Sequence, residues 1–71
     1  GDSTLVQRKQ LFEDQRLVVI QEMQELQKVL NTLDYKCWYY DQAIKEHTEA
    51  NVKNMSVDQM PIEIQEKYKA R

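Results

Sequence analysis

The chain has 71 residues, of which 41% are hydrophobic and 31% charged, with ten basic and twelve acidic side chains and a formal net charge of -2. A chain this short buries little surface, so its stability usually depends on a disulfide, a metal or a partner. A single cysteine cannot form an internal disulfide, and no Cys/His cluster is present to bind a structural metal. Oligomerisation is therefore the expected source of stability. The charge balance disfavours electrostatic binding of nucleic acid by this chain itself. One Gly and one Pro exclude β-rich and Rossmann-type folds.

The sequence also bears on where the protein works. No apolar run approaches the roughly 20 residues that span a bilayer, and no signal-peptide pattern is present. The unpaired Cys37 fits a reducing compartment, so we expect a cytoplasmic protein with no membrane contact. The first methionine is Met23, and we therefore expect a piece of a longer protein.

The first 47 residues are predicted to form one long helix. From Thr4 to His47 there is neither Gly nor Pro, and Thr4 and Gln7 have the spacing of a capping box. At about 1.5 Å per residue, this helix is about 65 Å long, too long for a domain of this size to bury.

A seven-residue repeat runs along this helix. The d positions are Leu5, Phe12, Val19, Leu26, Leu33 and Tyr40, and the a positions are Lys9, Arg16, Met23, Leu30, Cys37 and Ile44. Such a repeat makes a helix supercoil with a partner. The predicted dimer interface, called the seam below, comprises Leu5, Phe12, Val19, Met23, Leu26, Leu30, Leu33, Cys37 and Ile44.

The two helices of the dimer are expected to be antiparallel. A parallel pair stacks Lys9 on Lys9 and Arg16 on Arg16. In an antiparallel pair whose facing a and d numbers add up to 49, Lys9 faces Tyr40 and Arg16 faces Leu33, so both stems can lie on apolar partners. This register also brings Glu13 near Asp34, a smaller penalty because exposed charge pairs contribute only about 0–1 kcal/mol.

Three aromatic residues lie off the seam. Tyr35, Trp38 and Tyr39 are spaced i, i+3, i+4 and form one surface, the aromatic patch, on the back of the helix. Leu11, Leu17 and Val18 also lie outside the seam. Exposed aromatic patches usually mark a contact, so we expect another element to cover this one.

The helical pattern weakens after Ile44. Residues 48–71 are predicted to form a loop followed by a short helix over 57–69, with Ser56 as its cap and Pro61 near its first turn. Val57, Met60, Ile64 and Tyr68 line one side of that helix.

Nothing in the chain indicates catalysis or a bound metal or cofactor. His47 has no nearby cysteine and no HExxH arrangement, and Glu46 and Glu49 are ordinary helix surface. Cys37 occupies an a position, where a small hydrophobe serves as well. The sequence therefore predicts a protein that is not an enzyme.

The opening Gly1–Leu5 and the phrase Leu33-Asp34-Tyr35-Lys36-Cys37-Trp38-Tyr39-Tyr40 resemble the C-terminal part of MerR-family transcriptional regulators, nearest to the branch whose members are not the usual metal sensors. The resemblance covers residues 1–44. It implies an antiparallel dimerisation helix, an effector pocket near the ends of the coil, and operator DNA bound only through a winged helix-turn-helix that is absent from this chain.

These observations together predict an all-α fold. Residues 1–47 form an antiparallel two-stranded coiled-coil homodimer, and residues 48–71 form the loop and short helix. The expected function is dimerisation and effector sensing in a MerR-like bacterial transcription regulator. Tyr35, Trp38 and Tyr39 contact the DNA-binding head or a small apolar effector in this interpretation. The alternative is a structural coiled-coil spacer with no ligand.

Overall fold

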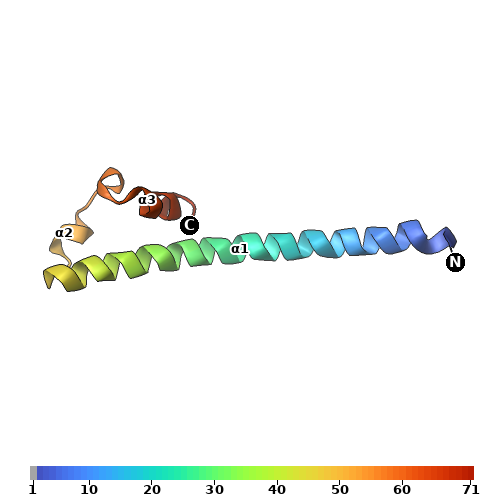
Figure 1. Ribbon diagram of the computed structural model, residues 1–71, viewed down its shortest axis with the longest axis horizontal. Coiled ribbons are helices and arrows are strands. Elements are labelled where there is room, and N and C mark those ends of the chain that lie inside the picture. The colour runs from blue at the N-terminus through green and yellow to red at the C-terminus, as the bar shows by residue number, and fades with distance from the viewer. Residues whose placement is uncertain (1) are drawn as a thin grey trace.

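The computed structural model describes residues 2–71, and within them every regular element is helical (Figure 1). A 3-10 turn, η1 (Asp2–Thr4), leads into the long helix α1 (Leu5–Glu46). A single turn of helix, α2 (Ala50–Lys53), a 3-10 turn, η2 (Val57–Gln59), and the helix α3 (Ile62–Lys69) follow. The predicted all-α fold and the long N-terminal helix are confirmed, while the single turn α2 was not predicted.

The molecule is a rod with a short return. Its extents are 68 × 20 × 13 Å, and its radius of gyration is 20.6 Å, against about 11 Å for a compact domain of this length. After α1 the chain turns back, and α2 and α3 lie along the C-terminal half of α1 (Figure 1). Residues 47–71 are called the tail below. None of the described helices has a segment long and apolar enough to cross a membrane.

The start of α1 differs from the predicted capping box. Thr4 is the N-cap residue, but its side chain makes no cap hydrogen bond. Its hydroxyl instead accepts a hydrogen bond from Arg8 Nε at 3.1 Å. Thr4 has φ -102° and ψ 0°, whereas an N-cap residue normally adopts the extended conformation that directs its side chain back to the helix N–H groups.

The end of α1 is fixed by a left-handed residue. His47 has φ 57° and ψ 22°. Its N–H bonds to Ile44 C=O at 3.3 Å, and the N–H of Thr48 bonds to Ala43 C=O at 3.1 Å. These two bonds form a Schellman motif, which ordinarily uses glycine at the left-handed position. The turn reverses the chain and sends the tail back along α1.

The predicted helix over 57–69 is wrong near its start, where Met60 and Pro61 are extended and separate η2 from α3. Pro61 disfavours helical geometry at the residue before it and has no N–H of its own. Ser56 and Gln59 form a capping box on η2, with Ser56 N–H donating to Gln59 Oε1 at 3.0 Å. The Ser56 hydroxyl also bonds to Asp58 and holds the pKa of that carboxyl below its ordinary value.

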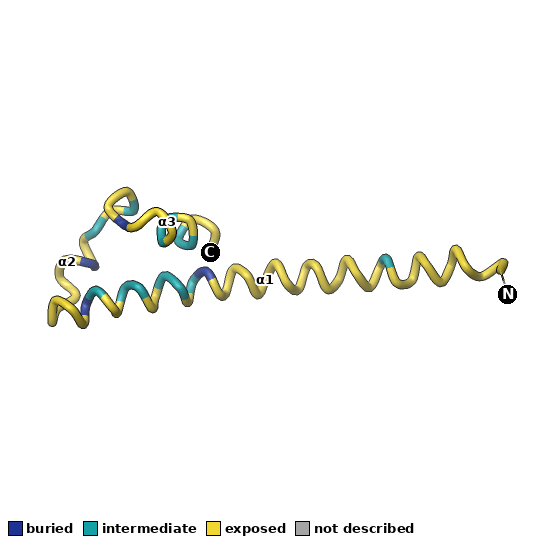
Figure 2. Tube along the Cα trace, in the orientation of Figure 1, coloured by how far each residue is buried: buried dark blue, intermediate teal, exposed yellow. Residues whose placement is uncertain are grey.

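A small core joins the tail to α1. Ala43 on α1 and Val52 and Met60 on the tail are its buried apolar residues, and Asn31 is a buried polar residue beside α3. The buried and half-buried parts of the C-terminal half of α1 face the tail (Figure 2). Val57, Ile64 and Tyr68 are half-buried, so the side of the tail that the sequence predicted as apolar is the less exposed one.

Candidate dimerisation surface and aromatic cluster

The seam is exposed to solvent in the single chain. All nine of its residues are exposed, as is Tyr40. Phe12, Met23, Leu26 and Ile44 keep 64%, 63%, 68% and 71% of their surfaces in contact with solvent. The tail covers a different face of α1, so among residues 2–71 the seam side chains stay exposed to solvent. A largely apolar stripe about eleven turns long, from Leu5 to Ile44, remains open along the rod.

Two cations interrupt the N-terminal half of the seam. Lys9 Nζ lies 3.4 Å from Glu13 Oε1, one turn further along α1, and the Lys9 side chain is 79% exposed. Lys9, Phe12, Glu13 and Arg16 line a shallow hollow of about 300 Å³. A second open hollow, of about 470 Å³, lies between Val18 and Leu26. The first hollow lies on the a/d stripe, whereas four of the five residues that line the second, Val18, Gln21, Glu22 and Glu25, lie off it.

The aromatic patch is partly covered by the tail. The Tyr68 ring of α3 meets the Tyr35 ring edge-on, with 4.9 Å between centroids. Trp38 and Tyr39 flank Tyr35, each 6.2 Å from it. Arg71 lies over the Tyr68 ring, with its guanidinium carbon 4.0 Å from the ring centroid. Tyr35, Trp38, Tyr39 and Tyr68 form one aromatic cluster between α1 and α3, of the geometry that aromatic pairs prefer.

Tyr39 ties the cluster to the turn. Its hydroxyl donates a hydrogen bond to Glu49 Oε1 at 2.9 Å. This bond favours the protonated phenol and, together with partial desolvation and the negative charge of Glu49, raises the pKa of Tyr39 above 10.0. The bond joins two residues ten positions apart in the sequence and holds the turn after α1 against the helix.

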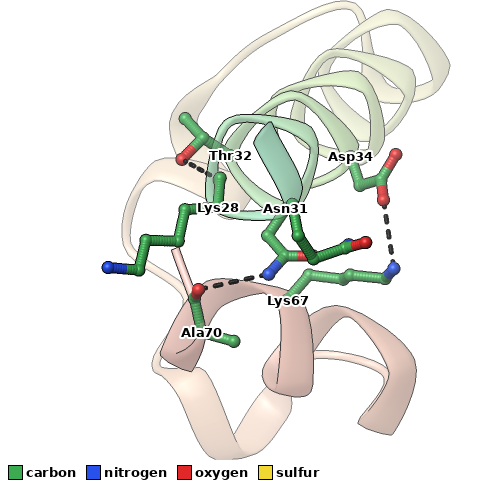
Figure 3. A network of polar contacts seen from close by, with 7 residues as sticks. Lys28, Asn31, Thr32, Asp34, Lys67 and Ala70 are labelled. Carbon is green, nitrogen blue, oxygen red and sulfur yellow. Dashed lines mark hydrogen bonds and ion pairs between the residues drawn. The ribbon is translucent and has the colours of Figure 1, made fainter. Parts of the chain in front are cut away.

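A polar network holds the end of α3 (Figure 3). Asn31 Nδ2 donates to Ala70 C=O at 3.1 Å, and Asn31 Oδ1 accepts from Gln27 at 2.9 Å. Beside this pair, Lys67 Nζ lies 3.2 Å from Asp34 Oδ2. Asn31 is only 6% exposed, and both polar ends of its side chain are satisfied, as burial of an amide requires.

Sequence reasoning missed part of this arrangement. Asn31, Lys67 and Ala70 gave no signal, because their contacts span 33 residues or more along the chain. Val52 is only 2% exposed, although it lies in the segment that the sequence predicted as a loop. The apolar periodicity of residues 57–68 placed Tyr68 on the apolar side of its predicted helix. This periodicity was the one sequence signal that Tyr68 packs against another element.

The described residues hold no group of three or more His, Cys, Asp or Glu side chains placed to bind a metal ion. Cys37 is a free, exposed thiol on the seam. Tyr35, Lys36, Tyr39 and Tyr40 line a shallow groove of about 380 Å³ beside the aromatic cluster. The groove is open and rimmed by phenols and one ammonium group, so it can accept a planar apolar molecule or a protein side chain.

No known family model matches the chain, and comparisons with characterised proteins and with solved structures give no significant match.

Proposed function

We propose that this chain is a homodimerisation module in which two copies of α1 pair antiparallel along the seam. One observation carries the proposal: the seam is exposed over its full length while the tail packs on another face. The chain exposes 6079 Å², against about 4,650 Å² for a compact protein of 8.5 kDa. The excess of about 1,400 Å² exceeds the roughly 800 Å² that each partner buries in a standard interface.

The antiparallel register explains the seam residues layer by layer. With facing numbers that add up to 49, Met23 meets Leu26 and Leu30 meets Val19. Near the ends, Cys37 meets Phe12 and Ile44 meets Leu5. Lys9 faces Tyr40 and Arg16 faces Leu33, where their alkyl stems can lie on apolar surface and their charges reach water. A parallel pair places both cations in self-facing layers, which is the less favourable choice.

The proposed biological role is that of a MerR-like transcription regulator. The support is the resemblance of the aromatic phrase at residues 33–40, together with the exposed seam. In this role the coil connects two DNA-binding heads that precede α1 in the full protein. The aromatic patch of Tyr35, Trp38 and Tyr39, with the groove beside Tyr35 and Tyr39, is the proposed contact for a head or a small apolar effector.

A spacer with no ligand is the second candidate, and the aromatic cluster favours it. Tyr68 packs on Tyr35 at 4.9 Å and Tyr39 bonds to Glu49. The cluster therefore has a structural role in holding the tail and does not require an effector. Ligand binding at the groove separates the two candidates.

The proposal is tested first by sedimentation equilibrium of the chain at micromolar concentration, where we expect a dimer and a clean 8.5 kDa monomer refutes the proposal. The regulator role is tested by the coding sequence upstream of Gly1, which should encode about 70 to 100 residues with a helix-turn-helix pattern. The full protein should then shift DNA from its own promoter region. An upstream sequence with no such pattern would leave the spacer as the better account.

A further inference from the structure

The ion pair between α1 and α3 lies at the edge of the seam. Lys67 Nζ is 3.2 Å from Asp34 Oδ2, and both side chains are 39% exposed (Figure 3). Asp34 directly follows Leu33, a d residue, and therefore occupies an e position on the flank of the seam. The tail thus places a positive charge beside the proposed dimer interface.

In the proposed antiparallel register, this flank contains a like-charge contact. The e residues of the two chains lie side by side, and the numbers of the nearest pairs add up to 47. Asp34 then lies beside Glu13 of the second copy, twice in each dimer. The other neighbours on this flank, Val6 with Asp41 and Ile20 with Gln27, have no like charges. Two facing carboxylates repel each other unless a cation lies between them.

Lys67 is the cation that pairs with Asp34 on this flank, and its position is fixed by the packing of α3. The bond from Asn31 to Ala70 C=O and the contact of Tyr68 with Tyr35 hold α3 on this side of α1. We propose that Lys67 bridges Asp34 of its own chain and Glu13 of a second copy, so that α3 belongs to the dimer interface. This inference rests on the antiparallel dimer proposed above.

The existing ion pair of Glu13 with Lys9 is compatible with this bridge. In the single chain Glu13 pairs with Lys9 at 3.4 Å and is half-buried. A carboxylate has about four acceptor sites and can accept from Lys9 and Lys67 together. Because the twofold axis is perpendicular to both helices, the two α3 helices lie on the same face of the dimer, each beside the partner's N-terminal half.

Cross-linking tests the geometry directly. In a Cys37→Ala background, Glu13→Cys and Lys67→Cys are introduced together and treated with a short bismaleimide. Residue 13 lies 21 residues from Asp34, about 30 Å along α1, so a short cross-link between the two positions can form only between chains. We expect a covalent dimer. The control pair, Gln15→Cys with Lys67→Cys, places the first thiol on the opposite flank and should cross-link poorly.

Dimer dissociation constants test the charge interaction. Lys67→Met should weaken the dimer by about three- to tenfold, since two weak ion pairs per dimer are lost. Lys69→Met, on the same helix, should leave the dissociation constant unchanged. Glu13→Gln should suppress the effect of Lys67→Met, and 1 M salt should abolish it because the Debye length falls to about 3 Å.

The outcomes separate this inference from the proposed function. A dimer whose Glu13 and Lys67 positions do not cross-link, and whose affinity is insensitive to Lys67→Met, overturns the bridge and leaves antiparallel pairing standing. A chain that is monomeric at all concentrations overturns both.

Discussion

Leu26 lies near the centre of the seam, and its replacement by Asp should separate the two chains. Leu26 is 68% exposed in the single chain, and in the proposed register it faces Met23, which is 63% exposed. Full burial of a Leu side chain stabilises by about 1.5–3 kcal/mol. About two-thirds of that, or about 1–2 kcal/mol, is therefore available to each Leu26 on dimerisation. The dimer contains two such layers, so Leu26→Asp removes about 2–4 kcal/mol of apolar burial.

The introduced charge adds to this loss. An unpaired carboxylate in an apolar layer costs several kcal/mol more, so the total is at least about 5 kcal/mol, a factor of more than a thousand in the dissociation constant. Sedimentation equilibrium over a hundredfold range of protein concentration measures the dissociation constant. Gln24→Asp, an exposed position off the seam on the same helix, is the matched control because it carries the same helix-propensity penalty. A Leu26→Asp chain that dimerises as tightly as the control would refute the seam.

Four further predictions concern the tail, the turn and the thiol. His47→Gly should raise the free energy of unfolding by about 1 kcal/mol, because glycine adopts the left-handed conformation without strain, and should raise the Tm by about 4–8 °C at fixed protein concentration. Tyr68→Ala should release α3 from α1, which limited trypsin digestion detects as faster cleavage within the tail. The dimer should persist on its seam but weaken about as much as with Lys67→Met, because Lys67 is no longer held beside α1. The pKa of Tyr39 is raised, so its bond to Glu49 stabilises the fold below pH 10 and is lost as pH rises through the folded-state pKa. Glu49→Gln should lower the pKa of Tyr39, and a pH titration followed by tyrosinate absorbance measures this change. Mild oxidation should not join two Cys37 residues rapidly, and complete cross-linking at low protein concentration would reject the antiparallel register.

The long helix was predictable because its signal is local and repeated. Residues 4–47 lack Gly and Pro, and the apolar residues recur every seven positions. The heptad repeat and the helix-favouring composition cover the same stretch, and the structure gives α1 from Leu5 to Glu46. The prediction of its end near His47 was accurate because the apolar repeat stops at Ile44.

The return of the tail could not be predicted, since it depends on a turn with no sequence signature. His47 takes the left-handed conformation that glycine usually supplies. The fold-back then joins residues more than 30 positions apart, such as Asn31 with Ala70. The aromatic patch was correctly predicted to lie off the seam, but its partner Tyr68 emerged only from the three-dimensional arrangement.

The break at Met60 and Pro61 illustrates a competition between signals. The apolar spacing of Val57, Met60, Ile64 and Tyr68 favoured one helix, and proline is tolerated in a first turn. Pro61 stands five residues after the cap Ser56, too far into a helix begun there. The backbone restriction at the residue before proline prevails, and the chain forms η2 and α3 in place of one helix.

The separation of the two Cys37 residues in the dimer tests the antiparallel seam most directly. Cys37 is the single cysteine of the chain and is exposed, so a nitroxide label attaches there without other changes to the sequence. In the antiparallel register the two copies lie 25 residues apart along the rod, and double electron–electron resonance should give one main distance of about 40 Å. Labels within about 15 Å of each other would show a parallel coil, in which Cys37 meets its own copy in one layer, and would contradict the account.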